Sequence, residues 1–286
     1  MVFSISMIKG RIGHTVRLIL LPIEITKFRL ARITGKAIFT DNEPLVSVVI
    51  PTMPSRLELL ESRAFNSLSQ QTYKNFEVLL VFDEINEKVF AIKDKFKNLD
   101  IQILTTRPTF KSYPDAKIRW MVGAIRPLNY GIKKSRGKWI ARLDDDDEWV
   151  PEHLSKSLEF AISNKLDFVS SHSTLIDKSG SRLDPAFRID DPYYTGNHSR
   201  KSIGPRIGSP ITWLMASNLK KIKYDRYSWV KKRNKPADLD MATRIYQSGA
   251  RIGFITESHA TVKPRGNVNE IGLAQFVNES ISATDK

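Results

Sequence analysis

The sequence contains no cysteine, which excludes disulfide bonds and cysteine-ligated zinc. It also lacks an apolar run that approaches the roughly 18–20 residues of a membrane-spanning helix. No secretory signal with a cleavage site, internal repeat or low-complexity tract is visible in the sequence. These absences favour a globular protein of a reducing compartment, so we expect a cytoplasmic location.

Acidic residues are too few to balance the basic ones, and the formal net charge is +14 at pH 7. Residues 1–43 hold seven Lys and Arg and three Asp and Glu, a net charge of +4. Residues 200–235 hold eleven Lys and Arg against Asp225 alone, a net charge of +10. The excess is therefore confined to two segments. It indicates an anionic partner at each of them, such as a membrane surface, a phosphate-bearing acceptor or nucleic acid.

The most informative stretch runs from Gly137 to Pro151, where a short apolar strand ends in a run of carboxylates. Adjacent carboxylates repel one another, so such a run is expected where a divalent cation or a polyhydroxy ligand offsets the repulsion. Ligands of open α/β sheets bind at the carboxyl ends of strands. A solvated acidic loop is the alternative interpretation. The run consists of Asp144, Asp145, Asp146 and Asp147.

Strand and helix patterns alternate along the chain, which predicts an α/β fold with a largely parallel sheet and helices on both faces. We expect strands at 46–50, 76–82, 101–104, 139–143, 211–216 and 251–256. Helices are expected at about 55–68, 89–96, 151–164 and 238–247. A further helix within 119–135 should be broken by Gly123, Pro127 and Gly131.

The N-terminal segment 11–36 alternates apolar clusters with Arg and Lys, and Pro22 should kink or split any helix there. Such a segment could lie in a membrane interface, with its apolar side down and its basic groups at the headgroups. The alternative is a helix packed on the body of the protein.

Acidic residues also stand at other expected element ends, namely Asp83 after a strand and Asp238 with Asp240 at a helix start. In combination with the aspartate run, the sequence resembles the family 2 glycosyltransferases, which have the GT-A fold, over about residues 45–262. The stretches that carry the resemblance are Val46–Thr52, Gln71–Asp83, Leu128–Ile132, Arg136–Ile140 and Leu143–Pro151.

The resemblance implies a nucleotide site. Asp83 would contact the base, Pro51 and Asp145 would belong to the same site, and Asp144 and Asp146 match the family's Asp-X-Asp motif. These two would hold ribose and a Mn²⁺ or Mg²⁺ ion bound to the diphosphate, with Asp146 as the main metal ligand.

Asp238 lies where the family carries its catalytic base. The dipole of the helix that it opens should keep the carboxylate ionised. The usual preceding Glu is replaced by Ala237, so Asp240 could serve instead, and Asp238 could merely cap its helix. Arg244 matches an arginine of the family on the same helix. Asp240, Arg244 and His259 are candidates for acceptor or diphosphate contacts.

The function implied is inverting transfer of a sugar from a nucleotide-diphosphate sugar, by default a UDP-sugar, to a hydroxyl of an anionic glycan or lipid-linked acceptor. We expect a basic amphipathic segment at 1–43 that associates with a membrane. A nucleotide-sugar-binding half at 44–150, an acceptor-binding half at 151–266 and a tail at 267–286 should follow. Attachment would be peripheral, on the inner membrane face.

Two other functions are compatible with parts of the sequence. A nucleotidyltransferase normally carries a Gly-rich phosphate loop early in the chain, whereas residues 51–58 have no Gly and only Arg56. A nucleic-acid-binding protein would fit the net charge, but no helix-turn-helix, zinc-finger or RNA-binding signature is present. We therefore expect no nucleic-acid partner.

Overall fold

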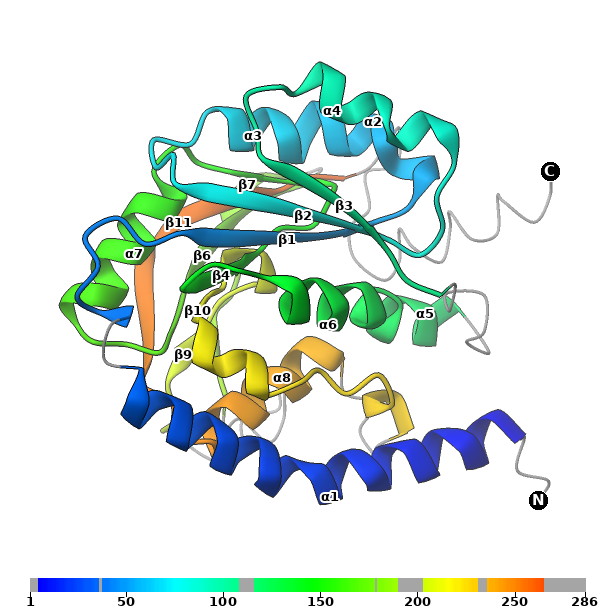
Figure 1. The fold of residues 1–286 in the computed structure, drawn as a ribbon, viewed down its shortest axis with the longest axis vertical. Coiled ribbons are helices and arrows are strands. Elements are labelled where there is room, and N and C mark those ends of the chain that lie inside the picture. The colour runs from blue at the N-terminus through cyan, green and yellow to red at the C-terminus, as the bar shows by residue number, and fades with distance from the viewer. Residues whose placement is uncertain are drawn as a thin grey trace.

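The protein is an α/β structure in which one curved sheet lies between helical layers (Figure 1). The computed structural model describes residues 5–35, 38–107, 116–177, 179–189, 203–230 and 236–264. The expected tail 267–286, the basic run 231–235 and the segment 190–202 lie outside the described residues. The predicted α/β fold class is confirmed.

The first half of the described chain supplies parallel strands. β1 pairs with β2 on one side and β4 on the other, and β3 extends the sheet beyond β2. Parallel strands are covered on both faces, which explains their nearly continuous apolar sequences. These strands are β1 (Val46–Thr52), β2 (Phe76–Phe82), β3 (Ile101–Thr105) and β4 (Trp139–Arg142).

The second half continues the same sheet with mixed directions, in the order β3-β2-β1-β4-β10-β6-β11-β5, with β7 on β6. β10 is antiparallel to both neighbours, and β11 is parallel to β6. These strands are β5 (Asp147–Trp149), β6 (Phe168–Asp177), β7 (Gly180–Leu183), β10 (Leu214–Ala216) and β11 (Ile252–Val262). A separate short pair is formed by β8 (Phe187–Arg188) and β9 (Arg206–Ile207).

Helices cover both faces. One face carries the run 54–69, which joins η2 (Pro54–Arg56), α2 (Leu57–Leu59), the π-helical turn η3 (Leu60–Phe65) and α3 (Asn66–Ser69), with η4 (Glu87–Val89) and α4 (Ala91–Lys95) beside it. The opposite face carries α5 (Ala116–Val122) and α6 (Ile125–Lys134). Further elements are α7 (His153–Ser163), η6 (Pro210–Thr212), η7 (Ser217–Lys221), η8 (Ser228–Val230) and α8 (Ala237–Gln247).

Side chains of β1 alternate between two apolar cores. Val48 and Ile50 face the core under α2 and α3, whereas Val49 faces the core shared with α6 and α8. Gly131 allows α6 to lie close to the sheet, because a Cβ there would stand 2.5 Å from a methyl of Val49. Beyond these cores, the carboxyl ends of β1, β2 and β4 meet a cavity.

Several local expectations were wrong. Pro127 and Gly131 lie inside α6 and do not break it. Pro22 lies inside one continuous helix, α1 (Ile5–Thr34). Pro22 is on the exposed side of α1, so water can bond the carbonyl that its missing N–H leaves unpaired. The expected strand at 211–216 begins as the 3₁₀ turn η6 and becomes β10 only from Leu214.

α1 lies along the outside of the second core and buries Phe28 completely. The segment 11–36 thus packs on the body of the protein, which was one of the two interpretations of its sequence. Within the described ranges, no helix has both the length and the apolar character needed to cross a bilayer.

Candidate active site

The aspartate run leaves β4 in a turn, which is closed by the N–H of Asp147 donating to the main-chain oxygen of Asp144 at 3.3 Å. Asp145 and Asp147 are buried, whereas Asp144 and Asp146 keep 30% and 20% of their side chains exposed. The turn thus leaves Asp144 and Asp146, the two aspartates of the Asp-X-Asp motif, as the partly exposed carboxylates of the run.

Arg142, the last residue of β4, joins two of the predicted site residues. Its Nε and Nη2 donate to the two carboxylate oxygens of Asp144 at 3.0 and 3.1 Å, and its Nη1 donates to Asp238. Asp238 reaches this position from the first turn of α8. The fold thus brings together two carboxylates that lie 94 residues apart in the sequence, with one guanidinium between them.

The alternative that Asp238 caps α8 is wrong. The N-cap position belongs to Pro236, and no side chain makes a capping hydrogen bond there. The carboxylate of Asp238 instead points to Arg142 and keeps 30% of its side chain exposed.

A second arginine holds the other half of the aspartate run. Nη2 of Arg56 lies 2.7 Å from Asp145 Oδ1 and 2.8 Å from Asp146 Oδ2, and Thr52 Oγ1 donates to Asp145 Oδ2 at 2.6 Å. Arg63 donates to the main-chain oxygen of Asp146 at 2.9 Å. Buried Asp145 therefore orients the loop, and Asp146 is the carboxylate left facing outward beside it.

Asp83 follows the end of β2 and accepts a hydrogen bond from Thr106 Oγ1 at 3.0 Å. Asp83 and Asp144 follow β2 and β4, and β1 lies between these two strands in the sheet. Both residues line a cavity of 540 Å³. Its wall includes Pro51, Arg56, Asp83, Arg119, Trp120, Arg142, Asp144, Asp145, Asp146, Asp238 and Lys263.

Loss of hydration shifts the carboxyl groups of this cavity. Burial raises the pKa of Asp145 to about 7, although Arg56 and Thr52 act in the opposite direction. Burial also raises the pKa of Asp238, against the effect of Arg142. The helix dipole was expected to lower the pKa of Asp238, but burial raises it instead. A carboxylate with a raised pKa is a stronger proton acceptor once it is ionised.

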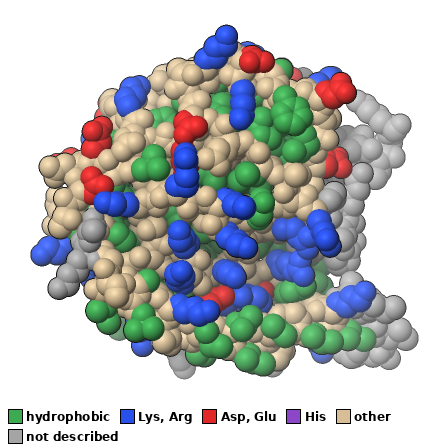
Figure 2. All heavy atoms as spheres, in the orientation of Figure 1, with side chains coloured by type: hydrophobic (Ala, Val, Ile, Leu, Met, Phe, Trp, Pro, Cys, Tyr) green, Lys and Arg blue, Asp and Glu red, His purple; other side chains and the backbone are tan. Residues whose placement is uncertain are grey.

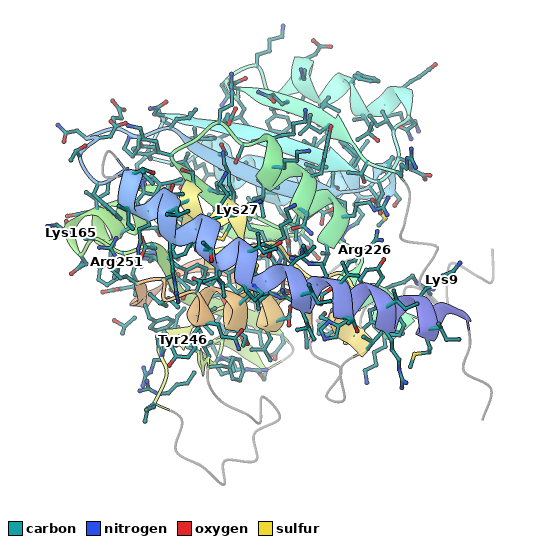
Figure 3. All side chains as sticks on the ribbon, turned by 60° about the horizontal axis from the view of Figure 1, so that its bottom comes forward. Lys9, Lys27, Lys165, Arg226, Tyr246 and Arg251 are labelled. Atoms are coloured by element: carbon teal, nitrogen blue, oxygen red, sulfur yellow. The ribbon has the colours of Figure 1, made fainter. Side chains whose placement is uncertain are left out.

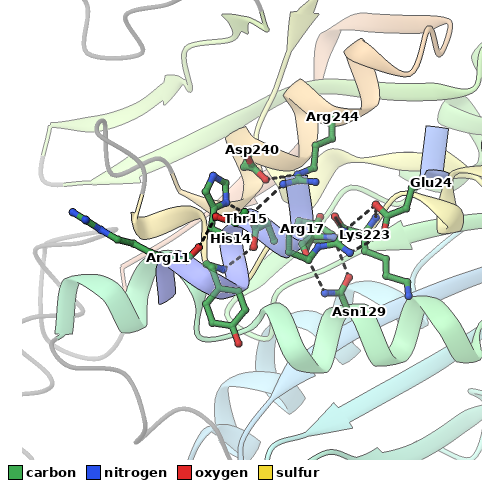
Figure 4. Close-up of polar contacts among 12 residues, drawn as sticks. Arg11, His14, Thr15, Arg17, Glu24, Asn129, Lys223, Asp240 and Arg244 are labelled. Carbon is green, nitrogen blue, oxygen red and sulfur yellow. Dashed lines mark hydrogen bonds and ion pairs between the residues drawn. The ribbon is translucent and has the colours of Figure 1, made fainter. Parts of the chain in front are cut away.

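Asp240 and Arg244 lie outside the cavity, contrary to the expectation of an acceptor or diphosphate contact. They form a buried ion pair at 2.6 Å within α8, and Arg244 also bonds Asp225, which is bonded in turn by His14 of α1 at 2.5 Å (Figure 4). Asp240 is only 2% exposed. It faces away from Asp238 because positions two apart on a helix point in different directions.

His259 is also outside the cavity. Its ring lies against the ring of His153 at 5.9 Å, and His153 stacks on Trp149 at 4.2 Å. Burial lowers the pKa of His259, so the ring is held neutral in an apolar setting. This placement supports a packing role.

The carboxylates facing the cavity suit a hard divalent cation. Mg²⁺ in nucleotide enzymes is commonly held by one or two protein carboxylates, with phosphate oxygens and water completing its coordination. Asp146 and Asp144 provide such oxygens, and no cluster of three or more metal-ligating side chains occurs among the described residues. The donor set fits an ion that arrives with a diphosphate.

Arg142 and Arg56 are site residues that sequence reasoning missed. Arg142 interrupts an otherwise apolar buried strand two residues before Asp144, which was a usable signal because a buried charge needs partners. Arg56 lies five residues after Pro51, at the start of the helix expected at 55–68. Its partners Asp145 and Asp146 are 89 and 90 positions further along the chain, so the pairing could not be predicted.

The comparison with known protein families identifies the family of this chain. Residues 47–223 match the family model described as glycosyl transferase family 2. This chain belongs to that family. The predicted family is thereby confirmed, and the match favours glycosyl transfer over nucleotidyl transfer and over nucleic-acid binding.

Similar curated proteins carry related names. The chain is 26% identical over 145 residues to a putative teichuronic acid biosynthesis glycosyltransferase, TuaG, of Bacillus subtilis, with a match that covers 51% of this chain and 53% of that protein. It is 24% identical over 135 residues to the Escherichia coli protein WfgD, a UDP-Glc:alpha-D-GlcNAc-diphosphoundecaprenol beta-1,3-glucosyltransferase, covering 47% and 48%. The matches thus span about half the length of these two relatives.

Solved structures show the fold. The structure of Staphylococcus aureus TarS 1–349 in complex with UDP-GlcNAc superposes with a TM-score of 0.56 at 18% identity, covering 78% of this chain and 60% of that one. The structure of TarS 1–349 alone gives a TM-score of 0.55 at 18% identity, with coverages of 83% and 72%. The predicted GT-A fold is confirmed.

Proposed function

We propose that this member of glycosyl transferase family 2 transfers a sugar from a UDP-sugar to an acceptor hydroxyl, with inversion and with help from a divalent metal. One observation carries the proposal. The aspartates that follow β4 and the carboxylate of Asp238 line one cavity, and Arg142 joins them. A donor-binding group and a proton acceptor are thus available to the same reacting centre.

UDP is the proposed nucleotide. The TarS structure that the chain resembles holds UDP-GlcNAc, and the name of WfgD specifies UDP-Glc. In this chain Asp83 would accept a hydrogen bond from the uracil N3–H, at the edge of the cavity beside Pro51. The nucleoside would then lie along the carboxyl ends of β1 and β2, where open α/β sheets bind nucleotides.

Asp146 and Asp144 would hold Mn²⁺ or Mg²⁺, with Asp144 near the ribose. A bound cation of this kind neutralises charge that develops on the departing diphosphate. Asp145, tied to Thr52 and Arg56, would keep Asp146 in place during turnover. Lys263 also lines the cavity, where its Nζ is paired with Glu148 at 2.6 Å.

Asp238 would act as the catalytic base. Its carboxylate takes the proton of the acceptor hydroxyl while the hydroxyl oxygen forms a bond to the anomeric carbon and the bond from that carbon to the diphosphate oxygen breaks. Attack from the face opposite the leaving group inverts the configuration. Arg142 would hold Asp238 in its ionised form and in register with the donor.

The acceptor is proposed to be an anionic glycan or lipid-linked molecule in polysaccharide synthesis, met at the inner membrane face. The names of TuaG and WfgD support this class, because teichuronic acid is a polyanion and a diphosphoundecaprenol carries charge on a lipid. The net charge of +10 in residues 200–235 supports it independently.

A panel of nucleotide sugars tests the function. The full chain is incubated with each UDP-, GDP- and dTDP-sugar and Mn²⁺, and release of nucleotide is measured with and without diphosphoundecaprenol-linked saccharides. We expect release from one UDP-sugar that rises when its acceptor is added. Binding of UDP by calorimetry should require Asp83. If no nucleotide binds in the presence of Mn²⁺, the proposal is wrong.

A further inference from the structure

Helix α1 packs Phe28, with Met7 and Ile25, on the second core, and it also exposes apolar residues on its outward side. On a soluble surface helix the apolar stripe faces the core. In α1 the exposed residues recur with helical spacing and form what we call the outer stripe. It consists of Ile8, Ile12, Val16, Ile19, Leu20, Ile23, Leu30 and Ile33, with Ile19 and Ile33 66% and 68% exposed.

The inward side of α1 carries polar groups. Buried Glu24 pairs with Arg17 at 2.8 Å, and Arg17 also donates to the main-chain oxygen of Lys223 at 3.2 Å. Nearer the C-terminus of α1, Arg29 and Arg32 donate to the main-chain oxygens of residues 248 and 249. These bonds tie α1 to the domain along its length and hold the outer stripe facing away from it.

Basic side chains border the outer stripe. Figure 2 shows apolar side chains along the edge of the molecule where α1 lies, with a band of Lys and Arg directly beside them. Figure 3 shows α1 across the outside of the domain with Lys9 and Lys27 along it. Exposed residues of this border include Lys9, Arg11, Lys27, Lys221 and Lys223, the last two in or just after η7, which α1 contacts.

From this arrangement we infer that the outer stripe and its basic border form a docking face for a bilayer that contains anionic phospholipid. A helix with an exposed apolar stripe and flanking Lys and Arg lies in the plane of the interface, with its apolar side at the acyl boundary. The stripe from Ile8 to Ile33 would extend about 38 Å at 1.5 Å per residue, long enough to anchor the domain flat on the surface.

Charge favours lipid over a second copy of this chain. Two copies joined through their stripes would bring the same basic borders together, and like charges opposed across an interface are unfavourable. A bilayer with anionic headgroups is complementary to both parts of this face. Its headgroups neutralise the basic border, and the boundary with its acyl chains buries the apolar outer stripe.

Helix α1 is connected to the cavity through η8 and α8. The N-terminal half of α1 packs on the segment around η8, where a Cβ at Gly10 would stand 2.7 Å from Val230 and one at Gly13 would stand 2.2 Å from Tyr227. η8 in turn contacts α8, the helix that brings Asp238 to the cavity. Given the proposed function, a bilayer on α1 would bring a lipid-linked acceptor close to Asp238.

Vesicle flotation with the full chain tests the docking face. Neutral phosphatidylcholine vesicles are compared with vesicles that contain 30 mol% phosphatidylglycerol, a composition of about one anionic lipid in three. We expect binding to the anionic vesicles to be at least about tenfold tighter and to weaken as salt is raised. The Ile12→Glu/Ile19→Glu variant should lose at least about tenfold of that binding, because it puts charge into the apolar stripe.

Phe90→Glu is the matched control, since Phe90 is 56% exposed next to α4, far from α1. It should bind vesicles like the unaltered protein, and both variants should keep UDP binding and their Tm. Equal flotation of Ile12→Glu/Ile19→Glu and the unaltered protein would overturn the inference. So would failure of the unaltered protein to float together with a dimer that Ile12→Glu/Ile19→Glu converts to monomer, which would assign the stripe to a second copy.

Flotation is measured without donor or metal, so it does not depend on catalysis. Asp238→Asn should float normally even though we expect it to lack transfer. Vesicle binding without sugar transfer would therefore count against the proposed function alone, and transfer to soluble acceptors without vesicle binding would count against the docking face alone.

Discussion

Two of the groups of carboxylate–arginine contacts in this molecule have opposite surroundings. At the cavity, Arg142 and Arg56 hold Asp144, Asp146 and Asp238, each of which keeps at least 20% of its side chain exposed, and Arg56 also holds the buried Asp145. Under α8, Arg244 holds Asp240 and Asp225, which are almost completely buried. The same chemical pair can therefore offer oxygens to a ligand in one place and fasten helices together in another.

In these two regions the exposure of the carboxylate, more than the residue type, distinguishes the proposed site residues from those that form buried ion pairs. Asp238 and Asp240 stand two positions apart on α8, and both have an arginine partner. Of the two, Asp238 meets the cavity and Asp240 does not. Replacing a carboxylate at the cavity should therefore change the rate of transfer, whereas replacing a buried one should change the stability of the protein.

The largest effect is expected from Asp238→Asn. It removes the proposed proton acceptor while keeping the side-chain volume, so transfer should fall by about 10²–10⁴-fold. UDP binding and the Tm should change little, because the side chain is not sealed in the core. Steady-state kinetics with the active UDP-sugar measures the loss. Transfer at the normal rate would move the base to another carboxylate.

A somewhat smaller effect is expected from Asp146→Asn. Loss of one charged oxygen facing the cavity should reduce transfer by about 10²–10³-fold, comparable to removing one electrostatic contact to a transition state. Raising the Mn²⁺ concentration should partly restore the rate, and EDTA should abolish the rate of the unaltered protein. Full activity of the unaltered protein in EDTA would contradict the metal role. Glu152→Gln, at the start of α7 away from the cavity lining, is the control.

On the buried side, Asp240→Asn should act on stability. Removing one partner of a buried ion pair typically costs about 3–5 kcal/mol, and the remaining bond of Arg244 to Asp225 should hold the loss near the low end of that range. Urea unfolding should show this decrease. The rate per folded molecule should stay within about threefold of the unaltered protein, the inverse of the Asp238→Asn result. If Asp240→Asn were as stable as the unaltered protein but transferred little sugar, the assignment of a structural role to Asp240 would be wrong.

The smallest effect is expected for the dependence of stability on pH. Because burial raises the pKa of Asp145 to about 7, the folded state binds more protons than the unfolded state between about pH 4 and 7. Stability should therefore fall as pH rises through that window. Asp145→Asn removes this contribution and should gain on the order of 1 kcal/mol relative to the unaltered protein between pH 5 and pH 8. Thermal unfolding at pH 5 and pH 8 measures the stability difference between Asp145→Asn and the unaltered protein. Asp94→Asn, which changes an exposed carboxylate, is the control and should show no such change with pH.

Much of the first half could be predicted from the sequence. Strands such as Phe76–Phe82 consist of buried apolar residues that have few alternatives, and the aspartates after Leu143 mark the strand end where ligands bind. The cavity carboxylates Asp83, Asp144, Asp146 and Asp238 follow from their positions at element ends.

What could not be predicted depends on tertiary pairing. Arg142 and Arg56 acquire their roles from partners that the fold brings to them, and no local pattern encodes those partners. The burial of Asp240 depends on Asp225 and on His14 of α1, which are distant in the sequence. The short strand β5 forms because β11, more than a hundred residues later, pairs with it.

The place of β10 in the sheet has a consequence for folding kinetics. Leu214 pairs with Ala141 on one side and Val169 on the other, so β10 closes the gap between two strands that are made much earlier. Contacts between residues far apart in sequence form slowly, because long loops must close first. Until residue 216 has left the ribosome, one edge of β4 is unpaired, and an open strand edge is a template for aggregation. Synthesis of this chain therefore passes through a stage in which a chaperone would be most useful, just before the three residues of β10 join the two parts of the sheet.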